Sequence, residues 1–365
     1  QCLRFCISKR GIILNYLSEK ARSIVPYTPG EQPRDKKYIK INTNENPYPI
    51  SPAAAQAAQA ALADSPLYPD PEAIQLKEVI ARREGLDISQ VFCSNGSDEA
   101  LAFSFMAFFD KSKKVLFPDI TYSFYPVYAR LFGIAYETVP LDENFQIDVD
   151  KYMKDNGGII FPNPNAPTGI FLPLVKIEEL LEYNLDKAAV IVDEAYIAFG
   201  GESAAGLINK YPNLLVVRTL SKSHSMAGLR VGYCLGNPAL IDGLNRIKNS
   251  FNSYVVDRCA MAAAAAGLAD EEYYNQTSRK IMATRERVRD RLLELGFSVL
   301  PSAANFIFIS PPGQDARGLY SFLREHGVLV RYFEGERVDK FIRVTIGTDE
   351  QMNEFLRIAE LFINN

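Results

Sequence analysis

The sequence lacks the long apolar runs and cysteine patterns that mark membrane proteins and disulfide-stabilised proteins. Its longest apolar stretches, such as the alanine-rich run at residues 260–266, are shorter than the roughly 20 residues that cross a bilayer. Residues 1–14 have no clean apolar core, so we expect no signal peptide. The cysteines show neither metal-ligand spacing nor a disulfide framework: Cys2, Cys6, Cys93, Cys234 and Cys259. We therefore expect reduced thiols, no metal and a cytoplasmic location.

Clustered positive charge is also absent. The chain has 365 residues and a formal net charge of −4, and its lysines and arginines are scattered along it. A nucleic-acid partner is therefore not expected. No G-x-G-x-x-G sequence opens a predicted strand–helix unit, which argues against an NAD-binding enzyme. With 47% hydrophobic residues, the chain can bury a large core and is long enough for two domains.

Short apolar segments alternate with helix-length segments between about residues 91 and 236. Runs such as VFCSNG, KVLFPD, GIIFPNP and LLVVRTLSKS predict βα units around a mostly parallel sheet covered on both faces. A long helical stretch follows from about residue 237 to 295, and strands and helices alternate again after it. We predict an α/β protein with a large domain at residues 51–255 and a smaller α+β domain at residues 256–365. Residues 1–50 are predicted to form an N-terminal arm and part of the smaller domain.

The segment VVRTLSKSHSMAGLRVGY places a lysine directly after a predicted strand. A lone lysine at such a position is usually solvated, but Lys222 has Thr219, Ser221 and Arg230 close to it in the sequence. Two hydroxyls and a guanidinium are the donors that hold a phosphate dianion while a nearby amine reacts with an aldehyde. The segment therefore predicts a site for a phosphorylated aldehyde.

The apolar run AAVIVDEAY ends in an acid, Asp193, which is followed by Glu194 and Tyr196. Ligands bind beyond the carboxyl ends of the strands in open parallel sheets, so Asp193 is expected to face the site. It could equally be the N-cap of a helix. A carboxylate opposite a pyridine nitrogen keeps that nitrogen protonated, and Tyr196 could hydrogen-bond the phenolic oxygen of the same ring.

Two further segments supply polar groups at the ends of predicted strands. In SNGSDEAL, a strand leads into a helix that is predicted to start near Ser97 or Asp98, where unpaired backbone N–H groups can bind a phosphate. Helix capping alone would explain these two residues equally well. In FPNPNAPTG, rigid proline positions can aim an asparagine side chain at a ligand.

Together, these four segments resemble the fold type I aminotransferases, which depend on pyridoxal 5′-phosphate (PLP), and in detail their histidinol-phosphate aminotransferase branch. The resemblance runs from NTNENPYPISP near Asn42 to FIRVTIG near Gly347. It implies that Lys222 holds the cofactor as a Schiff base. It also implies that Asp193 contacts the pyridine nitrogen and that Tyr196 donates to the phenolic oxygen.

The same resemblance implies the other cofactor contacts. Tyr122 of PDITYSFY is expected to stack on the ring. Asn165, with Asn163 behind it, is expected to contact the ring oxygen, because Ala166 stands where the family usually has asparagine. The implied phosphate contacts are Gly96, Ser97, Asp98, Thr219, Ser221 and Arg230, and Tyr68 of a neighbouring subunit. The resemblance thus implies a homodimer with shared active sites.

The implied substrates are small anionic molecules, L-histidinol phosphate and the glutamate/2-oxoglutarate pair. Arg343 of FIRVTIG resembles the arginine that holds the anionic group of aminotransferase substrates, and its fork of donors suits carboxylate or phosphate oxygens. Arg331 and Asn305 are secondary candidates. Asn46 and Tyr48 of NENPYP are further predicted substrate contacts.

The implied reaction is a transamination with ping-pong kinetics that gives imidazole-acetol phosphate and glutamate, with Lys222 as the base that moves the α-proton. Two enzymes of the same fold remain alternatives, an aromatic amino acid aminotransferase and a threonine-phosphate decarboxylase. A PLP-sensing regulator is another alternative, but it should carry a helix-turn-helix before NTNENP. The proline-rich residues there do not predict a three-helix unit.

Overall fold

The computed structural model describes residues 16–33, 35–313 and 315–364, so Cys2 and Cys6 lie outside the described residues. Its centre is a seven-stranded sheet in the order β2-β8-β7-β6-β5-β3-β4. The strands are β2 (Val91–Asn95), β3 (Val115–Pro118), β4 (Tyr136–Val139), β5 (Ile159–Pro162), β6 (Val190–Asp193), β7 (Leu214–Thr219) and β8 (Val231–Gly236). Only β8 runs antiparallel to its neighbours. The predicted α/β fold with a mostly parallel sheet is confirmed.

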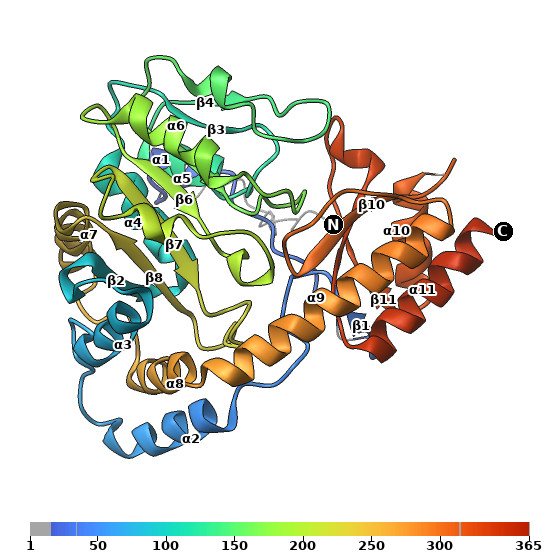
Figure 1. Ribbon diagram of the computed structural model, residues 1–365, viewed down its shortest axis with the longest axis horizontal. Helices are drawn as coiled ribbons and strands as arrows, with labels where there is room; N and C mark the ends of the chain where they lie inside the picture. Colours follow the sequence, from blue (N-terminus) through green and yellow to red (C-terminus); the bar gives the residue numbers. More distant parts are fainter. Residues whose placement is uncertain (1–15, 34, 314, 365) are drawn as a thin grey trace.

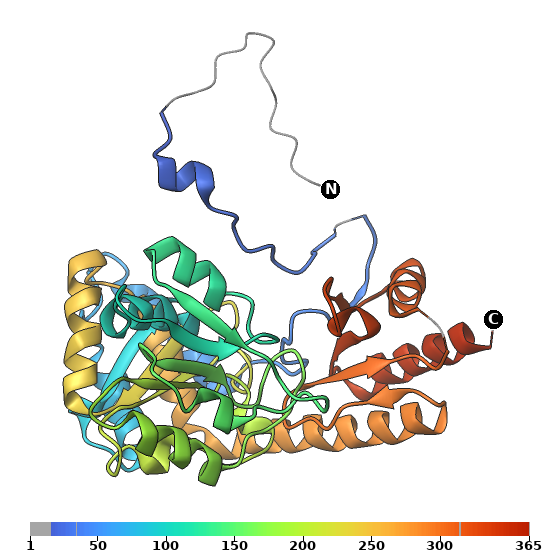
Figure 2. The ribbon, with the colours of Figure 1, turned by 90° about the horizontal axis from the view of Figure 1, so that it is seen from above.

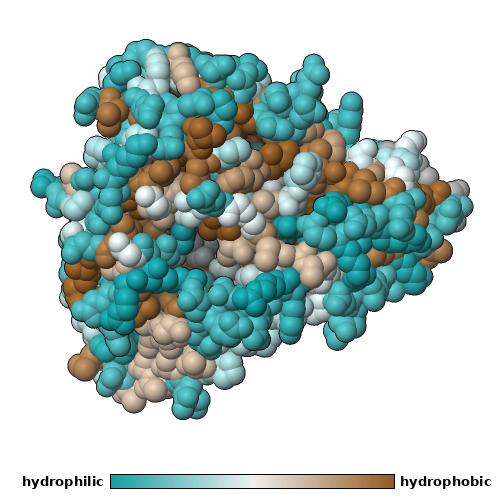
Figure 3. All heavy atoms as spheres, viewed as in Figure 1, coloured by the Kyte–Doolittle hydropathy of each residue, from teal (hydrophilic) through white to brown (hydrophobic). Residues whose placement is uncertain are grey.

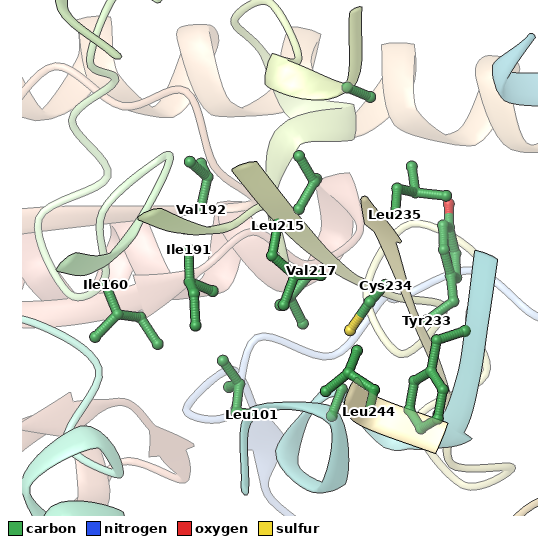
Figure 4. Close-up of a cluster of buried hydrophobic side chains, with 14 of the residues drawn as sticks. Leu101, Ile160, Ile191, Val192, Leu215, Val217, Tyr233, Cys234, Leu235 and Leu244 are labelled. Carbon is green, nitrogen blue, oxygen red and sulfur yellow. The ribbon is translucent and has the colours of Figure 1, made fainter. Parts of the chain in front are cut away.

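The inner strands of this sheet are buried on both faces, which explains why they read as continuous apolar runs. Successive side chains of a strand point to opposite faces. Figure 4 shows Ile191 of β6 directed toward Leu101 and Leu244, whereas the adjacent Val192 is directed to the other side. Both residues are fully buried, so β6 is held from above and below and its last residue, Asp193, has a fixed position.

Helices cover both faces of the large sheet (Figures 1 and 2). They are α3 (Ile74–Glu84), α4 (Gly96–Phe108), α5 (Tyr125–Phe132), α6 (Leu174–Asn184), α7 (Pro238–Phe251) and α8 (Arg258–Ala269), and α2 (Pro52–Ala61) packs on the outer side of α8. Helix α4 begins directly where β2 ends, so its N-terminus lies at the edge of the sheet. The predicted helical stretch after residue 237 consists of three helices, α7, α8 and α9 (Glu271–Glu294).

A second hydrophobic core lies around a small antiparallel sheet in the order β12-β13-β10-β9. This part contains β9 (Ser298–Val299), β10 (Phe306–Ser310), β11 (Val328–Leu329), β12 (Arg331–Tyr332), β13 (Ile342–Thr345), α10 (Ala316–Glu325) and α11 (Asp349–Ile363). Helix α9 joins the two cores, because Tyr274 packs in the first and Ile281 in the second. Helix α8 packs in the first core, and the division into domains at residues 50 and 255 stays a prediction.

The N-terminal arm contains α1 (Glu19–Ser23), a stretch without regular structure, and β1 (Ile39–Lys40), which pairs with β11. Figure 2 shows the arm crossing from the large part of the molecule to the small part. Glu31 of the arm accepts hydrogen bonds from Tyr320 and Arg324 of α10, which hold the arm against the small part of the molecule. No helix among the described residues is long and apolar enough to cross a membrane. The cytoplasmic location stays a prediction.

Candidate active site

One cavity lies where the carboxyl ends of β5, β6 and β7 face the small sheet and the N-terminal arm. This is the edge at which ligands bind in open α/β sheets. The predicted site residues that line it are Ser97, Asp98, Tyr122, Asp193, Tyr196, Thr219, Ser221, Lys222, Arg230, Arg331 and Arg343. Side chains that are far apart in the sequence thus meet in a single space.

The amine of Lys222 lies inside this cavity, three residues beyond the end of β7. Its Nζ donates to the backbone oxygen of Thr43 at 3.1 Å, and Asn46 fixes the lysine's own carbonyl oxygen with a hydrogen bond of 2.9 Å. Burial, helped by the positive charge of Arg343, lowers the pKa of Lys222 from 10.5 to about 8. Roughly a tenth of the amine is therefore uncharged at pH 7 and able to act as a nucleophile.

Asp193 ends β6 at the floor of the cavity and is only 4% exposed. Tyr125 donates its hydroxyl to Oδ2 at 3.0 Å, and the backbone N–H of Ala195 donates to Oδ1 at 3.2 Å. Burial raises the pKa of Asp193 to about 7 in spite of these hydrogen bonds. Asp193 is not a helix N-cap, because the next helical turn, Ile197–Phe199, has Tyr196 as its N-cap. A cation placed opposite the Asp193 carboxylate would restore full ionisation.

Tyr196 also reaches the cavity, where Asn44 fixes its hydroxyl. Asn44 Nδ2 donates to the tyrosine oxygen at 2.9 Å, and Asn44 Oδ1 accepts from Thr345 Oγ1 at 3.0 Å. Because the amide of Asn44 occupies one lone pair of the hydroxyl oxygen, the hydroxyl proton remains free to donate to a ligand.

A cluster of donors lies at the opposite end of the cavity from Arg343, around the start of α4. Arg230 Nη2 pairs with Asp98 at 2.9 Å, and Arg230 Nη1 donates to Ser221 Oγ at 3.3 Å. Thr219 Oγ1 donates to the same Ser221 oxygen at 3.0 Å. Ser97 adds the N-terminus of α4, whose first N–H groups have no partner within the helix. Two hydroxyls, a guanidinium and a helix N-terminus converge as a phosphate requires.

The backbone at this end is shaped to bring the guanidinium onto the helix. Gly96 has φ +75°, and a Cβ added there would lie 2.5 Å from Arg230 Nη2, so a side chain at this position would strain the backbone and displace the guanidinium. Arg230 itself has φ +53°, a conformation that non-glycine residues adopt at a cost. Such strain is typical of a position that function dictates. Gly96, a predicted phosphate contact, does not itself line the cavity, and its contact with the phosphate stays a prediction.

Tyr122 extends from the segment before α5 into the cavity, and its hydroxyl donates to Asp98 Oδ1 at 2.7 Å. Burial and the adjacent carboxylate raise the pKa of Tyr122 well above its usual value of 10, so the phenol stays protonated. The ring is half-buried and held edge-on against Tyr125 at 5.8 Å. It is a fixed aromatic surface, as stacking on a ligand ring requires.

The far end of the cavity carries two arginines from the small sheet. Arg343 Nη2 donates to the backbone oxygen of Asn42 at 3.2 Å, while its buried Nε has no partner among the described residues. Arg331 donates to the backbone oxygens of Thr28 and Pro29 in the arm, at 3.3 and 3.5 Å. Two guanidinium groups are thus available to an anionic ligand at this end, and that of Arg343 has an unused donor, Nε.

Several predicted residues are not brought to the cavity. Asn165 is 2% exposed, and its amide donates to Thr168 Oγ1 in its own turn and to the backbone oxygen of Ile120 in the segment after β3. Asn163 is bound to Leu172 of the same turn in the same way. The predicted residues that stand outside the lining are Gly96, Asn163, Asn165, Asn46, Tyr48, Asn305 and Tyr68. Their predicted ligand contacts remain predictions, and Asn46 acts instead on the backbone of Lys222.

Sequence reasoning missed the part of the lining that comes from the arm and from NTNENP. Tyr27, whose ring stacks on Phe124 at 4.2 Å, and Gly30 reach the cavity from the arm. Asn44 and Glu45 reach it from the segment after β1. NTNENP was recognisable as a motif, but the arm has no periodicity from which its path could be predicted.

A buried amine with a lowered pKa, a buried carboxylate and a cluster of donors that suits a phosphate meet at the carboxyl edge of this sheet, as in a fold type I aminotransferase site. The chain belongs to the aminotransferase class I and II family, whose model matches residues 36–358. The predicted family is therefore confirmed.

Several close relatives of this chain belong to one branch of this family. The histidinol-phosphate aminotransferases of Clostridium acetobutylicum and Pseudomonas entomophila are 53% and 54% identical to this chain, each over 93% of it, and it covers 97% and 98% of them. The crystal structure of histidinol-phosphate aminotransferase from Sinorhizobium meliloti in complex with PLP has a TM-score of 0.83 and 25% identity. That alignment covers 90% of this chain and 92% of the other.

Proposed function

We propose that this protein is a PLP-dependent aminotransferase that exchanges the amino group between L-histidinol phosphate and 2-oxoglutarate, giving imidazole-acetol phosphate and glutamate in histidine biosynthesis. The observation that carries the proposal is the meeting of Lys222, Asp193 and the phosphate cradle around Arg230 in one cavity. The relatives at 51–54% identity, all histidinol-phosphate aminotransferases, support the choice of substrate.

The residues present fit PLP on three counts. The donors at the start of α4 suit its phosphate, and the lowered pKa of Lys222 suits an amine that must react with its aldehyde. The raised pKa of Asp193 marks a buried acid with no cationic partner, which a protonated pyridine nitrogen would supply. Ser97, Thr219, Ser221 and Arg230 would hold the phosphate, and Tyr122 would lie against the ring.

When bound, PLP supplies an aldehyde that condenses with amines and a ring that accepts the electron pair left when an α-proton departs. Lys222 Nζ is the base within the cavity, and its pKa near 8 lets it take up and return a proton near neutral pH. The Asp193 carboxylate would hold a proton at the ring nitrogen, and the Tyr196 hydroxyl, whose oxygen Asn44 fixes, would donate to the phenolic oxygen of the ring.

Both substrates carry an anionic group that suits the arginine end. Arg343 keeps a buried Nε without a partner, so a bidentate grip on a carboxylate or phosphate would satisfy a donor that is otherwise unmet. Arg331 lies in the same lining and is held by the arm. We propose that glutamate places its α-carboxylate at this end and that histidinol phosphate, which has no α-carboxylate, places its phosphate there.

The proposal includes a homodimer in which Tyr68 completes the site of the neighbouring subunit. Tyr68 is 78% exposed, stacks on Tyr254 at 4.7 Å, and does not line the cavity of its own chain. Arg258 fixes its backbone oxygen at 2.7 Å. Leu62 and Leu67 nearby are also exposed, and the alanine-rich surface of α2 appears tan at the lower edge of Figure 3. An exposed apolar area of this kind is typical of a surface that another subunit covers.

A donor panel tests the proposed function. Purified protein with PLP and 2-oxoglutarate is offered L-histidinol phosphate, phenylalanine, tyrosine and threonine phosphate, and glutamate formation and carbon dioxide release are measured. We expect histidinol phosphate to give the highest kcat/KM. Preference for an aromatic amino acid, or carbon dioxide from threonine phosphate, would replace the proposal with one of the two alternatives of the same fold.

A further inference from the structure

Tyr125 touches Asp193 without reaching the cavity. It is the first residue of α5, is fully buried, and donates its hydroxyl to Asp193 Oδ2 at 3.0 Å. The residue is not part of the cavity lining, so it approaches the carboxylate from the protein side. Its ring packs between Phe105 and Phe117, at centroid distances of 6.4 and 5.9 Å. The hydroxyl is therefore held at one place by a rigid aromatic core.

Tyr125 belongs to a row of three tyrosines spaced by three residues, Tyr122, Tyr125 and Tyr128. Each hydroxyl has its own acceptor. Tyr122 donates to the Asp98 carboxylate at 2.7 Å, and Tyr128 donates to the Asp98 backbone oxygen at 3.0 Å. Of the three hydroxyls, only that of Tyr125 donates to Asp193. Tyr128→Phe removes a similar buried hydroxyl that bonds elsewhere, so it is a matched control for Tyr125→Phe.

The charges around Asp193 work against its ionised form. The carboxylates of Asp98 on α4 and Glu194 next in the chain disfavour a further negative charge, and burial does so more strongly. Four further titratable neighbours are uncharged near neutral pH: Tyr125 and Tyr128 on α5, Tyr196 beyond β6, and Cys234 on β8. The cations Lys222 and Arg230 line the same cavity but are not among the main causes of the pKa shift of Asp193. The two hydrogen bonds, from Tyr125 and from the Ala195 N–H, are what favour the carboxylate.

We propose that Tyr125 is a positioning residue that keeps Asp193 ionised and fixes the direction in which its carboxylate faces the cavity. The inference rests on the proposed function, in which Asp193 holds a proton at the pyridine nitrogen. With one carboxylate oxygen bound by Tyr125 and the other by Ala195, the carboxylate cannot rotate freely. Without the phenol, the acid form of Asp193 becomes more favourable, and the shared proton shifts from the ring nitrogen to the protein.

The first test measures the protonation of Asp193 in protein without cofactor. Infrared spectra are recorded from about pH 5 to pH 9, and the carboxylic-acid band that disappears in Asp193→Asn is assigned to this residue. In Tyr125→Phe, its titration midpoint should rise by about 1 to 2 pH units, as expected for the loss of a hydrogen bond to a charged group. In Tyr128→Phe, the midpoint should stay within a few tenths of wild type. Equal midpoints in Tyr125→Phe and wild type would overturn the inference.

The second test asks whether Tyr125 acts through Asp193. PLP affinity is measured for wild type, Tyr125→Phe, Asp193→Asn and the double variant. We expect Tyr125→Phe to weaken binding by about 10-fold in the wild-type background and by less than about 2-fold beside Asp193→Asn. An equal loss in both backgrounds would mean that Tyr125 serves only packing. Wild-type protein that fails to bind PLP at Lys222 would refute the proposed function itself, whereas the infrared titration needs no cofactor, so the two failures are distinguishable.

Discussion

Asn44 and Tyr196 are joined by a hydrogen bond of 2.9 Å that links the two parts of the molecule. Tyr196 follows β6 of the large sheet, whereas Asn44 is anchored to Thr345 of β13 through its side chain and its backbone N–H. Arg343, the proposed substrate arginine, lies two residues earlier on β13. The strand that would hold the substrate thus also fixes the phenol that would contact the cofactor.

We predict that Asn44→Ala weakens PLP binding by about 1 kcal/mol, because the Tyr196 hydroxyl loses the partner that orients it. Equilibrium titration of PLP into apo-protein measures the effect. Thr345→Val keeps the Asn44–Tyr196 contact but removes the anchor of Asn44, so it should show a smaller loss. If Asn44→Ala costs the same in a Tyr196→Phe background, the amide does not act through Tyr196.

The second prediction concerns the pH dependence of cofactor attachment. Lys222 has its pKa lowered to about 8 by burial first and by Arg343 second. Because a nearby positive charge disfavours the ammonium form, Arg343→Gln should raise this pKa by about 1 pH unit. The rate of covalent PLP attachment, followed by borohydride reduction and mass measurement, should then reach half its maximum at a correspondingly higher pH.

Arg331→Gln is the matched control, since Arg331 lines the same cavity but is not among the main causes of the lowered pKa of Lys222. Its attachment profile should superimpose on that of wild type. Shifts of equal size in both variants would attribute the effect to the net charge of the cavity instead of to Arg343.

A third prediction follows from the raised pKa of Asp193, which is about 7 in the folded protein against roughly 4 in an unfolded chain. A carboxyl group whose folded pKa is raised adds stability at low pH, and this stability is lost as the pH rises through the folded pKa. Relative to Asp193→Asn, wild-type apo-protein should therefore lose about 2 to 3 kcal/mol of unfolding free energy between about pH 5 and pH 8. Urea unfolding of both proteins at the two pH values measures this difference. A difference that is independent of pH would show that Asp193 is ionised in the apo-protein at both pH values.

The sequence predicts the site residues best where they come directly after a buried strand. The ends of β6 and β7 could be located because a buried parallel strand is an apolar run, so Asp193 and Lys222 were identified together with Arg230. Tyr125 and Asn44 were not found. Their importance comes from contacts at sequence separations of 68 and 152 residues, and neither a tyrosine in an aromatic core nor an asparagine in a polar loop is distinctive by itself.

The contact of Asn165 with the ring oxygen stays a prediction. A polar side chain in a buried turn can serve local hydrogen bonds as well as a ligand, and the amide of Asn165 donates to Thr168 and Ile120, whereas its buried Oδ1 has no partner among the described residues. The role of Tyr68 depends on a second subunit and so is not decided by the conformation of one chain. It is best tested directly.

The last prediction is that Tyr68 acts in the neighbouring subunit's site. Lys222→Ala subunits are mixed with Tyr68→Phe subunits, at a PLP concentration too low to load the Tyr68→Phe homodimer. If Tyr68 reaches across the interface, one site of each heterodimer carries both defects and the other carries neither. Activity should then rise above that of either parent. The loss in Tyr68→Phe itself should be about 1 to 3 kcal/mol of PLP affinity, the cost of a hydrogen bond to a charged group.

Lys222→Ala mixed with Asp193→Asn provides the matched control, because both residues line the same cavity of one chain. Each site of that heterodimer carries one defect, so no activity should be recovered whatever the role of Tyr68. Heterodimer formation is confirmed by mass in both mixtures. Recovery only in the mixture with Tyr68→Phe would place Tyr68 at the partner's cofactor. If neither mixture recovers, Tyr68 does not complete the site of the neighbouring subunit, and the prediction is wrong.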